Sequence, residues 1–183
     1  TVNTGSPDAF LAALDPAVAG AGALVYGSYL GGASPEEVGG LGVDVNGDAY
    51  IAGATQSVAF PVTPGVHDTT LDATFGVGNR TDVFVTRLDP FAPVGADTLV
   101  WSTLLGAEQN DYAWGLQLDA QGRPVIAGYT ASPSFPKSGC SAPKDNNWTA
   151  YVSRFDTEGA LQVSRLYGGA DADFGKALAL LPD

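Results

Sequence analysis

One stretch of this sequence occurs twice and constrains the fold more than any other feature. Residues 40–55 return as residues 115–130, at a fixed offset of 75 positions. The positions that keep the same or a similar residue are Gly40/Gly115, Leu41/Leu116, Val43/Leu118, Asp44/Asp119, Gly47/Gly122, Ile51/Ile126, Gly53/Gly128, Thr55/Thr130 and Phe60-Pro61/Phe135-Pro136. Because one repeat unit cannot bury its apolar face alone, the repeat predicts similar units packed against one another.

Each unit is predicted to contain four antiparallel strands. Two strands flank the turns at residues 44–48 and 119–123, where Gly47 and Gly122 supply the positive φ angle that a tight hairpin requires. A third strand ends at an Asp that can bond its own downstream backbone, and a fourth ends at a glycine turn. The predicted strands are residues 9–16, 24–32, 40–43, 50–55, 83–90, 99–106, 115–118, 124–130, 150–156, 161–169 and 175–180. Such evenly spaced four-stranded units are typical of β-propeller blades.

Composition favours the same fold class and excludes several partners. With 24 Gly, 12 Pro and only 15% charged residues, the chain favours short strands and turns over long helices. Its formal charge of −12 repels phosphate backbones and anionic lipid surfaces, so we expect no nucleic-acid partner. No apolar run is long enough for membrane insertion. Met is absent, even at position 1, and no charged-then-apolar leader opens the chain, which predicts a processed or excised chain and is compatible with export.

A longer phrase links the chain to a known family. Residues 82–90, 101–106 and 111–130, followed by Ser132 and Phe135-Pro136, match D-x-F-V-x-x-L-D-P, W-S-T-x-L-G-G and D-x-A-x-G-I-x-V-D-x-x-G-N-x-Y-V-x-G-x-T-x-S-x-x-F-P. By this phrase the chain resembles the β-propeller repeat family of secreted bacterial and archaeal proteins. The resemblance implies an all-β propeller in an extracellular or cell-surface protein. It implies no catalytic residue, and we expect neither a cofactor nor a metal.

The resemblance also implies a division into blades. We expect a partial blade at residues 1–32, whole blades at 36–106 and 111–169, and the first strand of a further blade at 173–183. Residues 1–7 faintly echo a missing second strand, which would give three blade equivalents. Because closed propellers have about four to eight blades, either the chain is a piece of a longer propeller or several copies meet. We favour copies that complete one another head to tail, as a ring or a filament.

Acidic residues recur once per unit, at Glu36, Asp111 and Asp173. A ring of carboxylates could bind cations or perform acid–base chemistry of the glycosidase kind. A residue repeated in every unit is, however, more typical of a turn cap or an acceptor for backbone amides, and we favour that structural interpretation.

Residues 44–48 begin like a calcium-binding loop, since Ca²⁺ takes carboxylate and amide oxygens at alternate positions. The second copy has Gln121 and Arg123 in place of Asn46 and Asp48, which favours a hairpin turn. The only histidine, His67, is expected to be a solvated loop residue.

The remaining candidates lie in loops. Asn79 and Asn147 each begin an N-x-Thr sequon and are possible glycosylation sites. Trp101 is expected to pack inside a blade, whereas Trp148 is nominated for contact with a ligand such as a glycan. Cys140, the only cysteine, is interpreted as a bystander thiol, with an intermolecular bridge or a ligand role as the alternatives.

Two functional hypotheses follow. The first is a non-enzymatic extracellular structural or adhesive module that assembles through strand edges with other copies of itself. The second is a propeller that binds or cleaves a glycan through its loops. The sequence contains no non-repeated cluster of Asp, Glu, His or Arg, which favours the first hypothesis.

Overall fold

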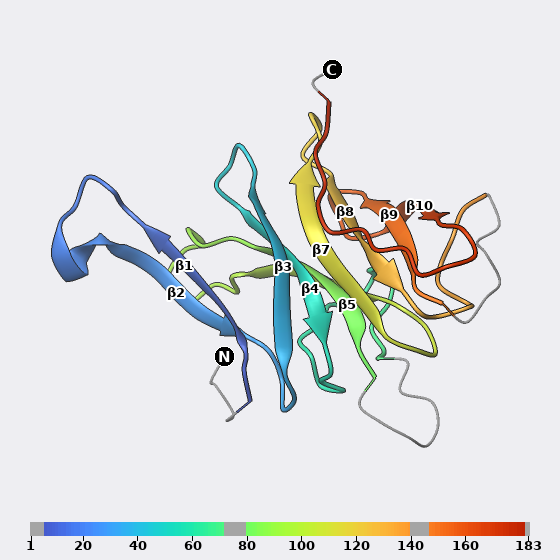
Figure 1. The fold of residues 1–183 in the computed structure, drawn as a ribbon. Coiled ribbons are helices and arrows are strands. Elements are labelled where there is room, and N and C mark those ends of the chain that lie inside the picture. Colours follow the sequence, from blue (N-terminus) through green and yellow to red (C-terminus); the bar gives the residue numbers. More distant parts are fainter. Residues whose placement is uncertain (1–5, 72–79, 140–146, 182–183) are drawn as a thin grey trace.

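The computed structural model describes residues 6–71, 80–139 and 147–181. It confirms an all-β fold with three antiparallel sheets, and within those ranges the only helical turn is the 3-10 turn η1 (Gly20–Ala23) (Figure 1). The strands are β1 (Ala9–Leu14), β2 (Leu24–Leu30), β3 (Glu36–Val43), β4 (Ala49–Thr55), β5 (Asp82–Leu88), β6 (Leu99–Leu105), β7 (Asp111–Leu118), β8 (Pro124–Thr130), β9 (Thr149–Phe155) and β10 (Leu161–Tyr167).

The sheets follow one another along the chain. The first sheet contains β1 and β2, the second has the order β3-β4-β5-β6, and the third has the order β10-β9-β8-β7. Strands that are consecutive within a sheet pair with each other, as the alternating sequence pattern predicted. The three sheets do not close into a ring over the described part of the chain (Figure 1).

The first strands of the second and third sheets begin earlier than the sequence predicted. β3 begins at Glu36 and β7 at Asp111, because each strand continues through a bulge that the repeat pattern did not reveal. The bulge falls at equivalent positions, between Val38 and Gly40 and between Ala113 and Gly115. A bulge adds one residue to a strand without ending its pairing.

The predicted hairpin turns are confirmed. Gly47 has a φ of 92° and Gly122 a φ of 74°, conformations that a residue with a Cβ rarely adopts. The Asp44 Oδ1 atom accepts hydrogen bonds from the amides of Asn46 and Asp48, at 2.8 and 3.0 Å. Asp119 makes the same two contacts in the second copy, so the Asp at this position caps the turn.

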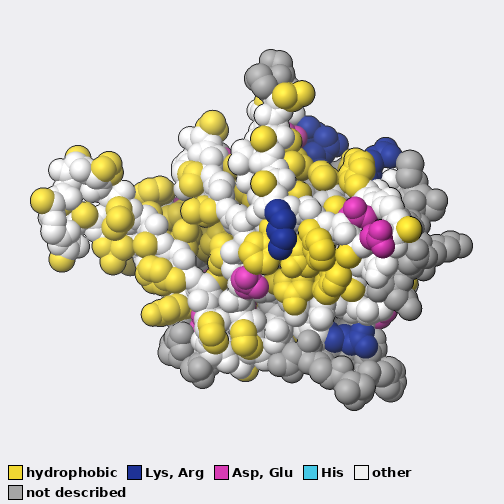
Figure 2. Space-filling model, in the orientation of Figure 1, with side chains coloured by type: hydrophobic (Ala, Val, Ile, Leu, Met, Phe, Trp, Pro, Cys, Tyr) yellow, Lys and Arg dark blue, Asp and Glu magenta, His cyan; other side chains and the backbone are white. Residues whose placement is uncertain are grey.

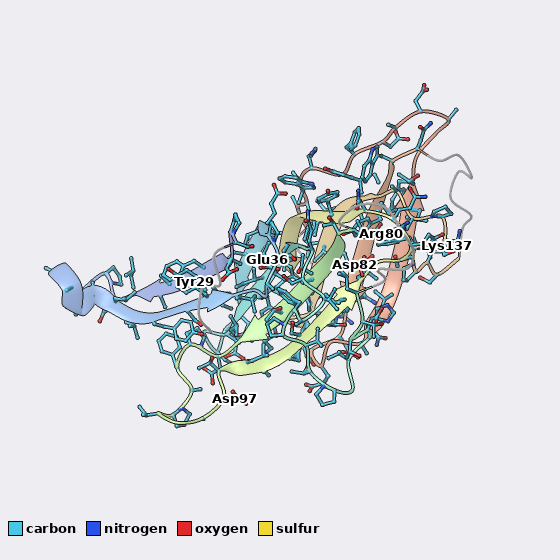
Figure 3. The ribbon with its side chains drawn as sticks, turned by 90° about the horizontal axis from the view of Figure 1, so that it is seen from below. Tyr29, Glu36, Arg80, Asp82, Asp97 and Lys137 are labelled. Atoms are coloured by element: carbon cyan, nitrogen blue, oxygen red, sulfur yellow. The ribbon has the colours of Figure 1, made fainter. Side chains whose placement is uncertain are left out.

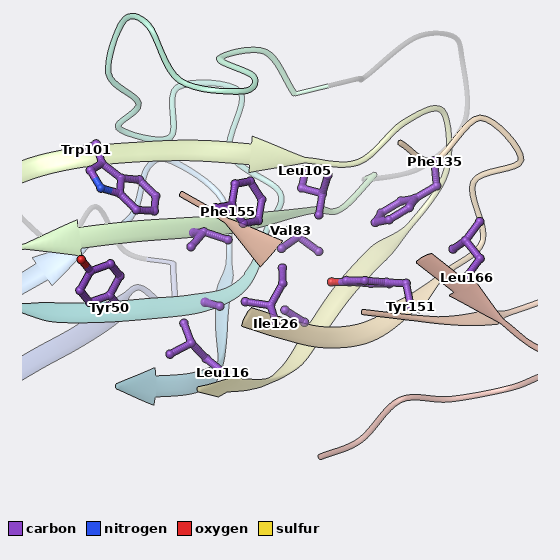
Figure 4. Close-up of a cluster of buried hydrophobic side chains, with 13 residues drawn as sticks. Tyr50, Val83, Trp101, Leu105, Leu116, Ile126, Phe135, Tyr151, Phe155 and Leu166 are labelled. Carbon is purple, nitrogen blue, oxygen red and sulfur yellow. The ribbon is translucent and has the colours of Figure 1, made fainter. Parts of the chain in front are cut away.

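Two hydrophobic clusters lie between consecutive sheets. The larger one joins the second sheet to the third and includes Tyr50, Trp101, Ile126, Tyr151 and Phe155 (Figure 4). The smaller one joins the first sheet to the second through residues such as Leu11, Leu30, Phe60, Phe84 and Leu88. The sheets therefore pack face to face in chain order.

Glycine allows the first strands of the second and third sheets to approach closely. A Cβ atom at Gly40 would lie only 2.6 Å from the amide nitrogen of Leu116 and 2.7 Å from its Cβ. Any larger residue at this position would push β3 away from β7. The glycines at the start of the repeat thus set the distance between neighbouring sheets.

Residues 173–181 carry no strand assignment, although the sequence predicted a first strand there. The segment lies against the face of β7 rather than beside a strand edge: a Cβ at Gly115 would be 3.1 Å from the Leu178 amide nitrogen. Because ladder hydrogen bonds form between edges, a segment packed on a face gains none. Leu178 nevertheless occupies on β7 the place that Leu116 occupies on β3.

Candidate functional site

The recurring acids act as acceptors for backbone amides. Glu36 accepts a hydrogen bond from Gly32 N–H at 3.3 Å, Asp111 from Ala107 at 3.0 Å and Asp173 from Gly169 at 2.8 Å. Each donor lies four positions before its acid, so the contact is the same in all three copies. The structural interpretation of these acids is confirmed, and Figure 3 places Glu36 at the start of its strand.

Hydroxyl groups also donate hydrogen bonds to the two buried acids. Ser57 donates to Glu36 at 2.6 Å, and Ser132 donates to Asp111 at 2.9 Å. Burial raises the pKa of Asp111 to about 8, so its carboxyl is largely protonated at neutral pH. A neutral carboxyl that already accepts two hydrogen bonds is poorly suited to holding a cation, which again favours a structural role.

The acids of the first hairpin turn are paired with Arg87. Its Nη2 atom lies 2.7 Å from Asp48 Oδ2 and 3.9 Å from Asp44 Oδ2, and its guanidinium lies over the Tyr50 ring at 5.5 Å. The hairpin interpretation of this loop therefore stands. In residues 6–71, 80–139 and 147–181 we find no group of three or more His, Cys, Asp and Glu side chains placed to hold a metal ion.

An aromatic cluster forms at one end of the third sheet. It consists of Tyr112 and Trp114 on β7, Tyr129 on β8, and Trp148 and Phe174 from flanking segments. The ring centroids of Tyr129 lie 5.1 Å from Trp148, 4.8 Å from Phe174 and 5.3 Å from Tyr112. The first two contacts are edge-to-face, a favourable geometry for aromatic pairs.

Lys176 lies within this aromatic cluster. Its ammonium nitrogen is 4.3 Å from the Trp114 ring centroid and 4.7 Å from that of Tyr129, both within the range of cation–π attraction. Figure 2 shows a basic side chain surrounded by hydrophobic side chains on this face of the molecule. The contact fixes residues 174–176 to the third sheet.

The sequence pointed to one member of the aromatic cluster but not to its partners. Trp148 was nominated for ligand contact, and the structure leaves it half-buried among Tyr112, Tyr129 and Phe174. A comparison of the two repeat copies could have identified the other aromatic residues of the cluster. The equivalents of Tyr112, Trp114 and Tyr129 in the first copy are Glu37, Gly39 and Ala54, so the aromatics are departures from the repeat.

The other predicted candidates lie apart from the aromatic cluster or outside the described residues. Asn79 and Cys140 fall outside the described ranges. Asn147 is exposed, and its Nδ2 atom donates to the Ala170 carbonyl at 3.0 Å. His67 is exposed, as predicted, and Trp101 is packed inside the larger core, where it donates to Thr157 O at 2.8 Å.

A second candidate site is the outer face of the first sheet, on which no sheet packs within the described part of the chain. We call this surface the open face and define it by Phe10, Leu14 and Tyr29. Phe10 is 57% exposed, whereas its equivalent in the second sheet, Phe84, is fully buried. Phe10 and Tyr29 stack on one another at 5.3 Å, and Figure 3 shows Tyr29 on the first sheet.

Comparisons with known proteins give no family for this chain. No protein-family model matches it, and no curated protein matches it. Among the described residues, no helix has the length and hydropathy that a membrane crossing requires.

Proposed function

We propose that this chain is an extracellular structural or adhesive module of the β-propeller type, without enzymatic activity, that assembles head to tail with other copies of itself. In this proposal the three sheets are successive blades. The location outside the cell follows from the repeat phrase at residues 82–136, which resembles that of secreted proteins.

The exposure of the open face carries the proposal. Phe10, Leu14 and Tyr29 have the same repeat positions as Phe84, Leu88 and Leu104, which are all buried between the first and second sheets. Fully burying such a side chain is worth about 1.5–3 kcal/mol. A contiguous apolar surface at positions built for burial is typical of an interaction site.

The experiment that tests the proposal is sedimentation velocity of the purified chain over a wide range of concentrations. We expect species larger than the monomer at micromolar concentration, formed reversibly on dilution. A chain that remains monomeric throughout this range would contradict the proposal.

The second candidate function is glycan binding through the aromatic cluster. Five partly exposed aromatic residues gather there, at positions where the first repeat has none. This favours glycan binding because aromatic faces stack on sugar rings. A glycan array with the native chain and with Trp148→Ala tests it, and Tyr167→Ala, an exposed aromatic outside the cluster, is the matched control. Specific binding that is lost in Trp148→Ala and kept in Tyr167→Ala would support glycan binding.

A further inference from the structure

The third sheet has a partly exposed apolar surface on the side away from the second sheet. A groove of about 640 Å³ opens there. Its apolar lining includes Val125, Val152, Val163, Leu180 and Leu181, and polar side chains, Arg154 among them, line the rest. The groove belongs to a sheet whose other face is already buried in the larger core.

The repeat identifies which surface fits this groove. Val125, Val152 and Val163 are the equivalents of Tyr50, Val85 and Trp101 of the second sheet. Those three side chains pack in the larger core against the third sheet, where Tyr151 and Phe155 enter from β9. The corresponding residues of the first sheet are Phe10 and Leu14, which belong to the open face. The groove and the open face are therefore the repeat equivalents of the two surfaces that pack together between the second and third sheets.

A polar group in the groove points to the same partner. Arg154 is the equivalent of Arg87, whose Nη1 atom donates to the Thr157 carbonyl of the next sheet at 3.2 Å. The Nε atom of Arg154 is buried and has no hydrogen-bond partner among the described residues. In a first sheet docked like the third, Pro16 takes the position of Thr157, and its carbonyl oxygen can accept a hydrogen bond.

A second patch of the same interface lies on β3. Leu41 is 54% exposed, whereas its equivalent Leu116 is 4% exposed because it packs against Gly40. The equivalents of Gly40 and Gly42 on the segment at residues 173–181 are Ala177 and Ala179, both small and exposed. Leu178 and Leu180 alternate with them, and Leu178 already packs against Gly115 of β7.

Side-chain sizes at this second patch are complementary. Leu118 packs against Gly42, within 3.3 Å of where a Cβ would be. In the corresponding contact between copies, Val43 takes the place of Leu118 and Ala179 takes the place of Gly42. The shorter side chain of Val43 therefore compensates for the methyl group of Ala179. The extra methyl of Ala177 under Leu41 requires a slightly wider spacing, as already seen between Gly115 and Leu178.

We propose that the occupant of these surfaces is a second copy of the chain. The open face of one copy docks into the groove of the other, and Ala177 and Ala179 then cover Leu41 and Val43 of the docked copy. This inference rests on the proposed function and names its partner and its contacts. The described residues of each copy supply three sheet positions, so two copies supply six, which lies within the range of about four to eight that closes as a propeller. The same head-to-tail contact then occurs twice and leaves no free end.

A disulfide trap tests the contact. In a Cys140→Ser background, Leu41→Cys and Ala177→Cys are introduced into one chain, and both sites are exposed, so the fold is retained. At the equivalent internal positions, a Cβ on Gly40 would lie 2.7 Å from the Leu116 Cβ, and one on Gly115 would lie 3.2 Å from the Leu178 Cβ. The wider spacing that a Cβ at position 177 requires brings the two Cβ atoms toward the roughly 3.5–4.5 Å of a disulfide. We expect mild oxidation to give a single covalent species with the mass of two chains. The matched control is Val45→Cys with Ala177→Cys, because Val45 lies in the exposed turn beyond β3; this pair is expected to stay uncrosslinked.

Three outcomes would overturn the inference, and they are distinct from one another. Assembly in sedimentation without the Leu41–Ala177 disulfide would refute this contact and leave the proposed function standing. A covalent ladder of three, four and more chains would refute the closed pair in favour of a filament. A chain that stays monomeric would refute the inference and the proposed function together.

A mixing experiment shows that the disulfide joins two chains. Chains with Leu41→Cys alone are mixed with chains that carry Ala177→Cys alone, and mass spectrometry of the oxidised mixture is expected to identify a dimer that contains one chain of each kind.

A substitution on the open face provides an independent measurement. Phe10→Asp places a charge where the groove is apolar, and we expect the dissociation constant of the pair to rise at least about 100-fold. Phe91→Asp is the control, since Phe91 is equally exposed but lies in the loop between β5 and β6. An equal effect of the two substitutions would overturn the docking of the open face.

Discussion

The first and second sheets carry the same pattern of residues in opposite environments. Phe84 on β5 stacks on Phe60 with ring centroids 4.7 Å apart and covers Gly53 of the neighbouring strand. Tyr151 on β9 repeats this arrangement with Phe135 and Gly128. Among the described residues, Phe10 has no strand equivalent to β4 beside it and no loop phenylalanine above it, and its ring lies against Gly27 of β2. The same repeat position is therefore a core residue or a surface residue according to whether another sheet packs on its face.

The largest expected difference is between the substitutions Phe84→Ala and Phe10→Ala, compared by their effect on the free energy of unfolding. Phe84→Ala removes a fully buried ring and is expected to lower the free energy of unfolding by about 3–5 kcal/mol. Phe10→Ala, measured at a concentration where the chain is monomeric, is expected to change it by less than about 0.5 kcal/mol. Urea denaturation followed by tryptophan fluorescence measures both. Similar losses would show that the open face is covered in the monomer.

A second pair concerns the strands that cross between sheets. Leu116→Ala is expected to cost about 2–5 kcal/mol of stability, because Leu116 is buried against Gly40. Leu41→Ala is expected to leave the monomer nearly unchanged and to weaken the pair of chains about tenfold, as the loss of about 1.4 kcal/mol implies. Sedimentation equilibrium measures the second effect. A Leu41→Ala chain with native stability and native affinity would break the equivalence of the two positions between copies.

The pH dependence of stability compares the native chain with Asp111→Asn. Burial raises the pKa of Asp111 to about 8 in the folded chain, so the folded state retains a proton that the unfolded state loses above pH 4. The stabilisation from this proton is complete at low pH and is lost as the pH rises toward about 8. Relative to the variant, the native chain is expected to lose roughly 1–3 kcal/mol between about pH 5 and pH 7. Parallel stability curves for the two chains would contradict the protonated state.

The smallest expected effect concerns β7, which is covered by residues 174–181, whereas Leu41 of β3 is exposed. Lys176→Gln removes the ammonium from the Trp114 and Tyr129 rings and is expected to cost about 0.5–1 kcal/mol. Hydrogen exchange at residues 174–181 should quicken with little change in the sheets. Lys137→Gln is the control for the loss of one positive charge, and equal exchange in the two variants would deny Lys176 a role in holding the segment.

Much of the fold was predictable because the repeat compares the chain with itself. Gly47 and Gly122, each following an amide residue, predict hairpins wherever they occur, and the Asp at the end of each third strand bonds its own turn. The bulges at Gly39 and Trp114 were not predictable, because a bulge changes the pairing register without changing the apolar pattern. The missing strand at residues 173–181 has a similar cause: the pattern gives a strand-like sequence, but only a paired edge makes it a strand.

The candidate sites divide in the same way. The structural role of Glu36, Asp111 and Asp173 could be inferred from their recurrence. Neither the cation–π contact of Lys176 nor the fit between the open face and the groove could be inferred, since both join residues far apart in sequence.

The sequence by itself determined the elements of this protein: the strands, the turns and their order, all of which depend on interactions over a few residues and on a repeat that is visible in one dimension. Only the tertiary structure decided which of the repeated apolar residues are buried. Burial depends on the distance between whole sheets, which the glycine at position 40 and its equivalents set, and on whether another sheet lies on a given face. That is why Phe10 and Phe84, equal in the sequence, are unequal in the molecule.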